Sequence, residues 1–489
     1  MNKEAVTYNY NIRNWLTSIS STNFQENLVY VGGLHPRFNG NVAYMNWKVG
    51  SESNARAYNF TYDALDRLTM ASYSGAGNYT TEYTYDLNGN FTTLKRNGLQ
   101  DGGTYGLTDN LTFTLNGNQV TRVEDAVNDP TYNGAFNFMD GASQQNEYTY
   151  DKNGNLTKDL NKKISSIQYN SLNLPTSITY SNGKSAAYIY DAAGRKLRTS
   201  YKTSASATAI PTDYCGNMIY ENNVLKQILI DGGYITLNGS TPQYHYYLQD
   251  HLGNNRVVCN TSGTAEQVNH YYPFGGLFGE STNGDTQRFK YNGKELDRMH
   301  GLDWYDYGAR HMDGMRFTTM DPLAEKYYGL SPYAYCGNNP ISRIDANGMD
   351  WVQRTYGGVT EYYYDREIKS QEDINRRYGD NSGILYINNN SSYELGGETY
   401  TFVNDKKDNK YGYVIKGSEK QDKTKIIYGD NYTIFGTSDN SVNAKTLHKN
   451  YLGTSYTGPN NPKDYNGNDS YQYIPRNKSE YGSYIHDIL

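Results

Sequence analysis

Apolar and polar residues alternate in short runs along the first half of the chain. Four runs share one order: alternating positions rich in Tyr, then Tyr-Asp, a small polar turn and a further apolar residue. They are YNFTYDALDRLT (58–69), EYTYDLNGNFT (82–92), EYTYDKNGNLT (147–157) and AYIYDAAGRKLR (187–198). A period of two is typical of a β-strand with one buried face. Each run therefore predicts a strand, a turn and a returning strand.

The turns carry a residue pair that ends in glycine, at 88–89, 153–154 and 193–194. Such pairs supply the positive φ of a tight hairpin, and Leu156 or Leu197 would then start the return strand. Weaker copies of the pattern occur at 8–19 and 167–178. A unit recurring every 20 residues or so predicts a ribbon of stacked antiparallel hairpins, in which the repeat residues serve stability rather than chemistry.

Composition supports a folded chain despite a low hydropathy. Of 489 residues only 36% are hydrophobic, whereas 53 are Tyr and 48 are Gly. Low hydropathy alone favours disorder, but a tyrosine ring buries a large area and keeps a hydroxyl for a hydrogen bond, which suits half-buried β-sheet. The formal charge of -6 gives no general attraction to nucleic acid or anionic membranes. Three widely spaced cysteines indicate neither a disulfide framework nor a zinc site.

The sequence does not contain a targeting signal that we recognise. The first 20 residues lack an apolar core, and no stretch approaches 18 apolar residues, so we predict neither a signal peptide nor a membrane span. Export would need a route that this chain does not encode.

The repeat array resembles the YD repeats of RHS proteins, which are bacterial relatives of teneurins and of the C subunits of insecticidal toxin complexes. The resemblance covers roughly Tyr8 to Tyr247, patchily between Leu94 and Gln145, and implies that residues 1–243 form a hollow β-shell that acts as a container. From residue 244 the chain reads YHYYLQDHLGNNRVV, then YYPFGGLFG, then FKYNGKELDRMHGLDWYDYGAR. These pieces resemble, in order, the RHS repeat-associated core. We therefore expect residues 244–349 to close the shell and to precede a variable C-terminal toxin.

In that family the core is similar to an aspartic protease that cuts its own chain. The resemblance places the catalytic residues at Arg310, Asp321 and Asp345, and the scissile bond between Met349 and Asp350. Two close carboxylates can share a proton, so that one activates water while the other acts as an acid, and a guanidinium can orient them.

Two departures from the family pattern bear on this prediction. The family reads GARYYDPxxGRFxSxDP where this chain has GARHMDGMRFTTMDP, and Ala346 stands where proline is usual. Judged without the family, an Asp-Pro in a Gly- and Asn-rich stretch is simply a turn.

The segment after Asp350 has lost the repeat pattern. The sequence of residues 350–445 predicts short strands and turns. From Asp350 to the end of the chain, Lys and Arg nearly equal Asp and Glu in number, so we expect no nucleic-acid partner. The tail, 446–489, joins a Gly/Asn loop, YTGPNN, to a helix-like end.

This tail resembles the calcium loop and His-Asp pair of secreted and parvovirus-type phospholipase A domains. The resemblance implies Ca²⁺ held by the carbonyls of Tyr456, Gly458 and Asn460 and by the carboxylate of Asp487, with His486 as general base. No cofactor is expected for the shell or the core. The alternative is a turn followed by a surface histidine. Because the sequence stops soon after Asp487, we expect a truncated and inactive cargo within a fragment of a larger toxin.

The sequence as a whole predicts a mainly β fold: a spiralling shell of antiparallel hairpins, closed by the core and followed by a small α+β domain. The predicted function is that of an RHS-type polymorphic toxin in interbacterial competition, secreted or displayed at a cell surface. Its expected partners are its own cargo, an immunity protein, delivery proteins and a phospholipid substrate. The alternative is a non-enzymatic surface or adhesion protein whose repeats bind partners or glycans.

Overall fold

The computed structural model describes residues 4–50, 52–127, 135–345, 347–348, 351–352, 392–395, 398–405 and 410–416. The chain divides into two compact units, Met1–Gly357 and Gly358–Leu489. The first unit holds the repeats and the core.

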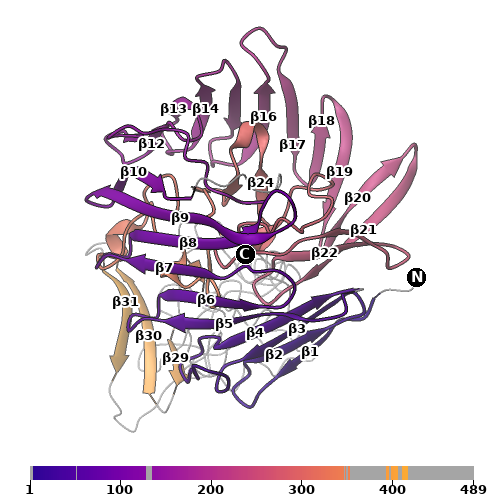
Figure 1. Cartoon of the computed structure of the whole chain (residues 1–489), viewed down its shortest axis with the longest axis vertical. Helices are drawn as coiled ribbons and strands as arrows, with labels where there is room; N and C mark the ends of the chain where they lie inside the picture. The colour runs from indigo at the N-terminus through magenta and orange to yellow at the C-terminus, as the bar shows by residue number, and fades with distance from the viewer. Residues whose placement is uncertain are drawn as a thin grey trace, which may run out of the picture. The chain divides into compact units, whose positions relative to one another are not determined.

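The N-terminal half of the first unit is a single antiparallel sheet in which every strand pairs with the next along the chain (Figure 1). Such a meander is what consecutive hairpins produce. Its strands are β1 (Thr7–Tyr10), β2 (Leu16–Ser20), β3 (Phe24–Val29), β4 (Tyr44–Val49), β5 (Arg56–Tyr62), β6 (Leu68–Ser74), β7 (Thr81–Tyr85), β8 (Phe91–Leu99), β9 (Tyr105–Asn116) and β10 (Gln119–Asp125).

A second antiparallel meander of thirteen strands follows. It continues across the predicted boundary at residue 244 and ends only at Val268. Its strands are β11 (Tyr148–Tyr150), β12 (Leu156–Asp159), β13 (Ile164–Tyr169), β14 (Pro175–Tyr180), β15 (Ser185–Tyr190), β16 (Lys196–Lys202), β17 (Ile210–Cys215), β18 (Met218–Glu221), β19 (Val224–Ile230), β20 (Gly233–Asn238), β21 (Thr241–Gln249), β22 (Asn255–Asn260) and β23 (Ala265–Val268).

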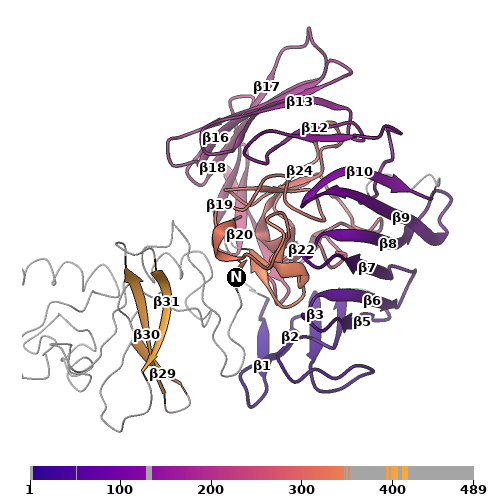
Figure 2. The ribbon, with the colours of Figure 1, turned by 90° about the vertical axis from the view of Figure 1, so that its left-hand side faces the viewer.

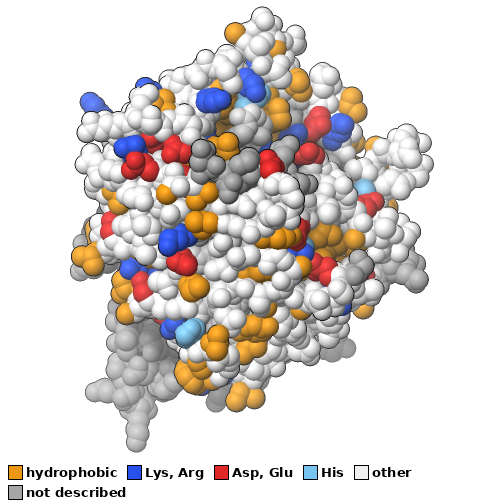
Figure 3. All heavy atoms as spheres, viewed as in Figure 1, with side chains coloured by type: hydrophobic (Ala, Val, Ile, Leu, Met, Phe, Trp, Pro, Cys, Tyr) orange, Lys and Arg blue, Asp and Glu red, His pale blue; other side chains and the backbone are white. Residues whose placement is uncertain are grey.

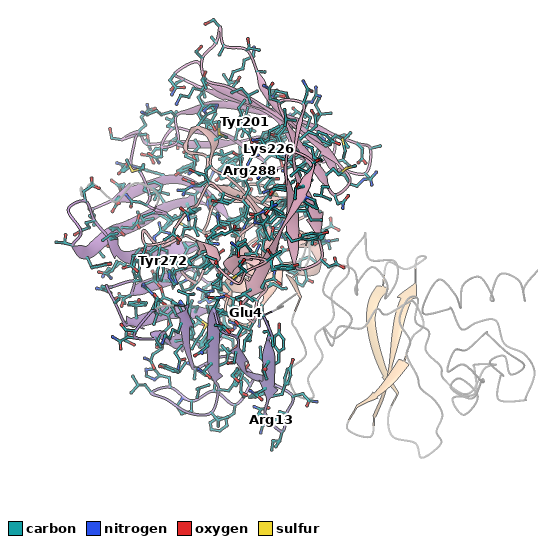
Figure 4. The ribbon with its side chains drawn as sticks, turned by 90° about the vertical axis from the view of Figure 1, so that its right-hand side faces the viewer. Glu4, Arg13, Tyr201, Lys226, Tyr272 and Arg288 are labelled. Carbon is teal, nitrogen blue, oxygen red and sulfur yellow. The ribbon has the colours of Figure 1, made fainter. Side chains whose placement is uncertain are left out.

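The two sheets are joined at both ends. Between β10 and β11, the backbone N–H of Glu147 donates to the carbonyl of Thr121 at 2.8 Å. At the opposite ends, Asn23 in the β2–β3 turn donates from its side chain to the carbonyl of Gly263 in the β22–β23 turn, at 2.8 Å. Glu4 accepts a second bond from Asn23 at 2.9 Å (Figure 4). The first unit is therefore closed around an interior by contacts between its first and last hairpins.

The Tyr-Asp pair has a defined structural part in each hairpin. Asp86 accepts backbone N–H bonds at its Oδ1 from Asn88 and Asn90, both at 2.9 Å, and so holds the turn. The Tyr85 hydroxyl donates to the carbonyl of Leu68 in the preceding hairpin, at 2.6 Å. In the same turn Gly89 has φ = 85°, as predicted. Tyrosine thus ties one repeat to the previous one, and aspartate closes its own turn.

Alternation of side chains directs the aromatic rings inward. In β5, Tyr58, Phe60 and Tyr62 are all buried. Behind the first sheet, Tyr79 stacks on Phe278 of the core with ring centroids 3.6 Å apart. Burial of tyrosines in this way accounts for a folded chain with few aliphatic residues.

The core segment after Val268 runs inside the curve of the two sheets (Figures 1 and 2). Tyr272 donates to the carbonyl of Asn97 on β8 at 2.8 Å, whereas Arg288 contacts Glu221 on β18, and Figure 4 labels both core residues. The segment contains two small sheets. One has three strands, β24 (Glu295–Asp297), β25 (Trp304–Asp306) and β26 (His311–Met312), and the other has two, β27 (Ile344–Asp345) and β28 (Trp351–Val352). Its 3-10 turns are η1 (Tyr291–Gly293), η2 (Met299–Gly301), η3 (Ala324–Lys326) and η4 (Cys336–Asn338).

The described part of the second unit is a three-stranded antiparallel sheet of β29 (Ser392–Leu395), β30 (Glu398–Asp405) and β31 (Lys410–Lys416). The predicted helix at the end of the tail lies outside the described residues. In the described part of the chain, no helix has the length and apolar character to cross a bilayer. The face of the protein in Figure 3 shows scattered Lys, Arg, Asp and Glu side chains among mostly uncharged ones.

Candidate active site

Arg310 lies in the turn that connects β25 with β26, and it is only 1% exposed. The turn is closed by a bond from the Tyr307 N–H to the Arg310 carbonyl at 3.0 Å. The guanidinium carbon lies 3.6 Å from the ring centroid of Phe317, so the charge is stacked on an aromatic face. A buried cation in this position needs anionic partners.

Two carboxylates meet on one nitrogen of this guanidinium. Arg310 Nη2 is 2.8 Å from Asp321 Oδ2 and 3.1 Å from Asp345 Oδ2. The structure thus brings together the three residues that the sequence predicted as catalytic, although 24 residues separate Asp321 from Asp345. The shortened spacer after Arg310 does not prevent this contact.

Asp345 also organises the backbone that follows it. Its Oδ1 accepts the N–H groups of Asn347 at 3.1 Å and Gly348 at 2.6 Å. The Gly348 carbonyl in turn accepts a bond from Arg310 Nε at 2.5 Å. Gly348 has φ = 78°, and a Cβ at this residue would lie 2.7 Å from the Arg310 backbone nitrogen, so only glycine fits.

A short antiparallel strand pair, β27 and β28, includes one of the two carboxylates. Asp345 of β27 is paired with Trp351 of β28 in antiparallel register. Met349 and Asp350 themselves, and Ala346, lie outside the described residues.

The electrostatics of the two carboxyl groups differ. Burial raises the pKa of Asp345, the positive charge of Arg310 lowers it, and the negative charge of Asp321 raises it again, with a result of about 6. The Asp321 side chain is 10% exposed, whereas that of Asp345 is 0% exposed. Asp321 also borders a small pocket lined by Tyr327, Leu330 and other residues.

The geometry suits acid–base chemistry on a nearby peptide. The raised pKa of Asp345 lets this carboxyl group keep a proton at mildly acidic pH, and the more accessible Asp321 is the one that water can reach. Arg310 contacts both carboxylates and a backbone carbonyl of the same loop. The Pro332 carbonyl accepts a hydrogen bond from Arg310 Nη1 at 3.2 Å. The sequence did not predict this carbonyl, Phe317 or Gly348 as parts of the site. A backbone carbonyl cannot be recognised in a sequence, because every residue has one. Gly348 could have been recognised, because a glycine directly before the predicted scissile bond indicates a backbone conformation that other residues rarely adopt.

The predicted calcium and lipid site belongs to a part of the chain that is not described. Tyr456, Gly458, Asn460, His486 and Asp487 all lie outside the described residues.

Comparisons with known proteins address the repeats. Residues 169–208 match the family model described as RHS Repeat. This segment is therefore similar to an RHS repeat. The matched residues span β13 to β16, where the Tyr-Asp pattern is clear.

Three curated relatives extend the similarity. Salivary gland surface protein 1 of Aedes aegypti is 32% identical over 235 residues, which are 43% of this chain and 7% of that protein. The tRNA nuclease WapA of Bacillus subtilis is 27% identical over 283 residues, 55% of this chain and 11% of that protein. The tRNA3(Ser)-specific nuclease WapA of Bacillus spizizenii is 27% identical over 252 residues, 48% of this chain and 10% of that protein. The chain therefore spans a small part of the length of the curated relatives that it matches.

Among solved structures, the chain is similar to a complex of TcdB2 and TccC3, with 17% identity, 70% of this chain and 19% of the other covered, and a TM-score of 0.48. It is also similar to the Photorhabdus luminescens Tc holotoxin pore, with 16% identity and a TM-score of 0.47. That similarity covers 73% of this chain and 19% of the other.

Proposed function

We propose that this chain is part of an RHS-type toxin whose core cuts its own backbone after Met349 and so separates a C-terminal cargo from the repeat container. The RHS repeat and the toxin relatives support the container and toxin assignment. The observation that carries the cleavage proposal is the pair of contacts from Arg310 Nη2 to Asp321 and Asp345, with the Gly348 backbone held by the same groups.

The proposed reaction is hydrolysis of one peptide bond. Asp321, as the more accessible carboxylate, takes a proton from a water molecule, whose oxygen attacks the carbonyl carbon of Met349. Asp345 supplies its proton to the leaving nitrogen of Asp350, and the products are a carboxyl group on Met349 and a new amino terminus. Arg310 keeps the two carboxyl groups together and holds the Gly348 carbonyl, which fixes the approach of the next peptide.

The proton distribution follows from the raised pKa of Asp345. Cleavage requires a protonated Asp345, so its rate should fall as the pH rises above about 6. A rate that falls as the pH rises is the behaviour expected when the group that titrates acts as the acid.

Intact-mass measurement of the purified chain tests the proposal. We expect a break after Met349 in the native chain, and a single species of 55.5 kDa in the Asp321→Asn and Asp345→Asn variants. Asp297→Asn is the matched control, because Asp297 is a half-buried core carboxylate that accepts bonds from the hydroxyls of Tyr188 and Tyr201 instead. An uncut native chain would rule out self-cleavage.

The cargo is a separate proposal. The tail is proposed to be phospholipase-like and to use calcium, by its resemblance alone. Calcium-dependent release of fatty acid from phospholipid vesicles by the purified protein, lost in His486→Ala, would support it. No release would leave the tail an unassigned toxin.

The adhesion alternative is favoured by one comparison, because the Aedes aegypti relative is named a surface protein. An adhesion protein would not require a catalytic role for Arg310, Asp321 or Asp345. An uncut native chain would therefore favour it over the toxin proposal.

A further inference from the structure

A buried His–Glu pair lies where the repeat pattern places neither residue. His251 follows Asp250 in the turn between β21 and β22, and this turn is built like those of the repeats. Asp250 Oδ1 accepts the N–H groups of Leu252 and Asn254, both at 3.0 Å. The residue after the turn aspartate or asparagine is exposed at Ala64, Leu87, Lys152, Ser171, Ala192 and Thr261. His251 is only 5% exposed.

Its partner is equally unusual. Glu26 lies on β3, between Phe24 and Leu28 on the inward face of the strand, and it is 0% exposed. A carboxylate at a core position costs stability unless it is paired. Glu26 Oε2 accepts the backbone N–H of His251 at 3.0 Å, and Oε1 lies 3.1 Å from His251 Nδ1.

The other ring nitrogen reaches the segment that leads to the candidate site. His251 Nε2 is 2.9 Å from the carbonyl oxygen of Ile341, four residues before Asp345. A carboxylate and a carbonyl are both acceptors, so both ring nitrogens face acceptors. Both contacts are hydrogen bonds only when the ring carries two protons, that is, as an imidazolium.

The same three residues could be mistaken for a metal site, because ligand atoms of Glu26, Asp250 and His251 lie within 4.8 Å of one another. Each of these side chains already makes hydrogen bonds to other groups of the protein. Asp250 Oδ2 accepts from Arg256 Nε at 2.7 Å and from the Asn254 side chain at 2.8 Å. The cluster is therefore a closed set of hydrogen bonds rather than a cation site.

We propose that His251 is a positioning residue that links closure of the repeat sheets to assembly of the cleavage site, by clamping Ile341 against Glu26. This proposal rests on the proposed self-cleavage. The clamp joins β3 of the first sheet, the last turns of the second sheet and the strand that carries Asp345. Two neighbouring contacts act in the same direction: Asn338 donates to the carbonyl of Gly89, and Asn339 donates to the side chain of Asn41.

The clamp has a predictable response to pH. The groups that face the ring are Glu26 from β3, Asp250 from its own turn with Arg256 of β22 beyond it, and the Ile341 carbonyl. Burial lowers the pKa of His251, but the charges of Glu26 and Asp250 and the hydrogen bonds to Glu26 and Ile341 together outweigh it, so the net pKa is raised. A raised histidine pKa means that the stabilisation is complete at low pH and is lost as the pH rises through the folded-state pKa. A neutral ring would leave either Glu26 or Ile341 facing a bare nitrogen.

Glu26→Gln separates this clamp from simple packing. A glutamine amide can donate to a neutral Nδ1 while Nε2–H still donates to Ile341, so the clamp persists without charge. His251→Leu removes both ring contacts. His245→Leu is the matched control, because His245 also pairs with a glutamate, Glu266, but at the surface-facing edge between β21 and β23.

The test is hydrogen exchange, followed by mass spectrometry, of peptides covering 336–345 in an Asp321→Asn background that does not cut. We expect His251→Leu to speed exchange there by about tenfold, the effect of one lost hydrogen bond, and His245→Leu to leave it unchanged. After correction for intrinsic rates, protection should fall between pH 6 and pH 9 in the parent but not in Glu26→Gln.

Equal exchange in His251→Leu and the parent, or the same pH dependence in the parent and Glu26→Gln, would overturn the clamp. If His251→Leu does not fold, the comparison of the parent with Glu26→Gln decides alone. In the cutting background, compared at one acidic pH, His251→Leu should slow cleavage and Glu26→Gln should cleave at the parent's rate. An uncut native chain would refute self-cleavage while the exchange experiment still decides the clamp.

Discussion

The repeat turns and the core site use the same pair of residue types, arginine and aspartate, in opposite settings. In a repeat turn, Arg195 Nε contacts Asp191 Oδ2 at 2.6 Å, four residues away, and the arginine side chain is 75% exposed. In the core, Arg310 contacts Asp345 from 35 residues away, and both side chains are buried. The first pair is formed by neighbours in sequence and is screened by solvent. The second exists only after the chain has closed, and its charges have no solvent to replace a lost partner.

The largest expected effect comes from breaking the buried pair. Arg310→Met should lower the free energy of unfolding by about 3–5 kcal/mol, because two carboxylates lose their buried counter-charge. Arg195→Met should have little effect, since its carboxylate partner stays in water. Urea denaturation of both variants followed by tyrosine fluorescence measures the contrast. Similar losses in the two variants would contradict it.

The pH dependence of Asp345 sharpens the comparison. Its folded-state pKa is raised to about 6, so the native state binds a proton more tightly than the unfolded state, and Asp345 costs stability as the pH rises from about 4 to 6. The Asp345→Asn variant lacks this cost. We expect the difference in unfolding free energy between native chain and variant to change by about 3 kcal/mol over that window.

Parallel denaturation series at several pH values would measure this difference. A constant difference from pH 4 to pH 7 would show that Asp345 titrates normally. The same series on Asp86→Asn provides the control, because that aspartate lies in a repeat turn.

The smallest expected effect lies in the repeat turn itself. Asp86→Ala should cost about 1–2 kcal/mol, because the backbone N–H groups of Asn88 and Asn90 lose their acceptor. Asp86→Asn should cost less, since Asn170 makes the same two bonds in its own turn with its Oδ1. Thermal unfolding of the two variants should rank them in this order. The reverse order would mean that the charge, rather than the acceptor, holds the turn.

Much of the repeat architecture could be predicted, because its determinants lie within one hairpin. The Tyr-Asp pair, the glycine of the turn and the alternating strand are all visible in 82–92, and the structure has β7, a turn with Gly89 at positive φ, and β8 there. The mainly antiparallel β class follows from the recurrence of this unit. The sequence did not indicate that the second sheet continues to Val268, since β21 to β23 no longer carry the Tyr-Asp spacing.

The candidate site could be predicted only in part. Resemblance to a family selected Arg310, Asp321 and Asp345, and the structure brings these three side chains together. It could not indicate Phe317 beneath the guanidinium, the Pro332 carbonyl, or the link from Glu26 through His251 to Ile341. These contacts join residues that are distant in sequence, and two of them involve backbone carbonyls that every residue possesses.

The sequence by itself determined what is periodic and local: strands, turns, the inward tyrosines and the RHS repeat. Only the tertiary structure decided which carboxylates share the Arg310 guanidinium, how burial raises the pKa of Asp345, and which turn contacts Ile341 of the core. The physical reason is that turn hydrogen bonds are made within a few residues. Burial of a charge, by contrast, depends on everything that packs around it, and in this protein that surrounding comes from both sheets and the core.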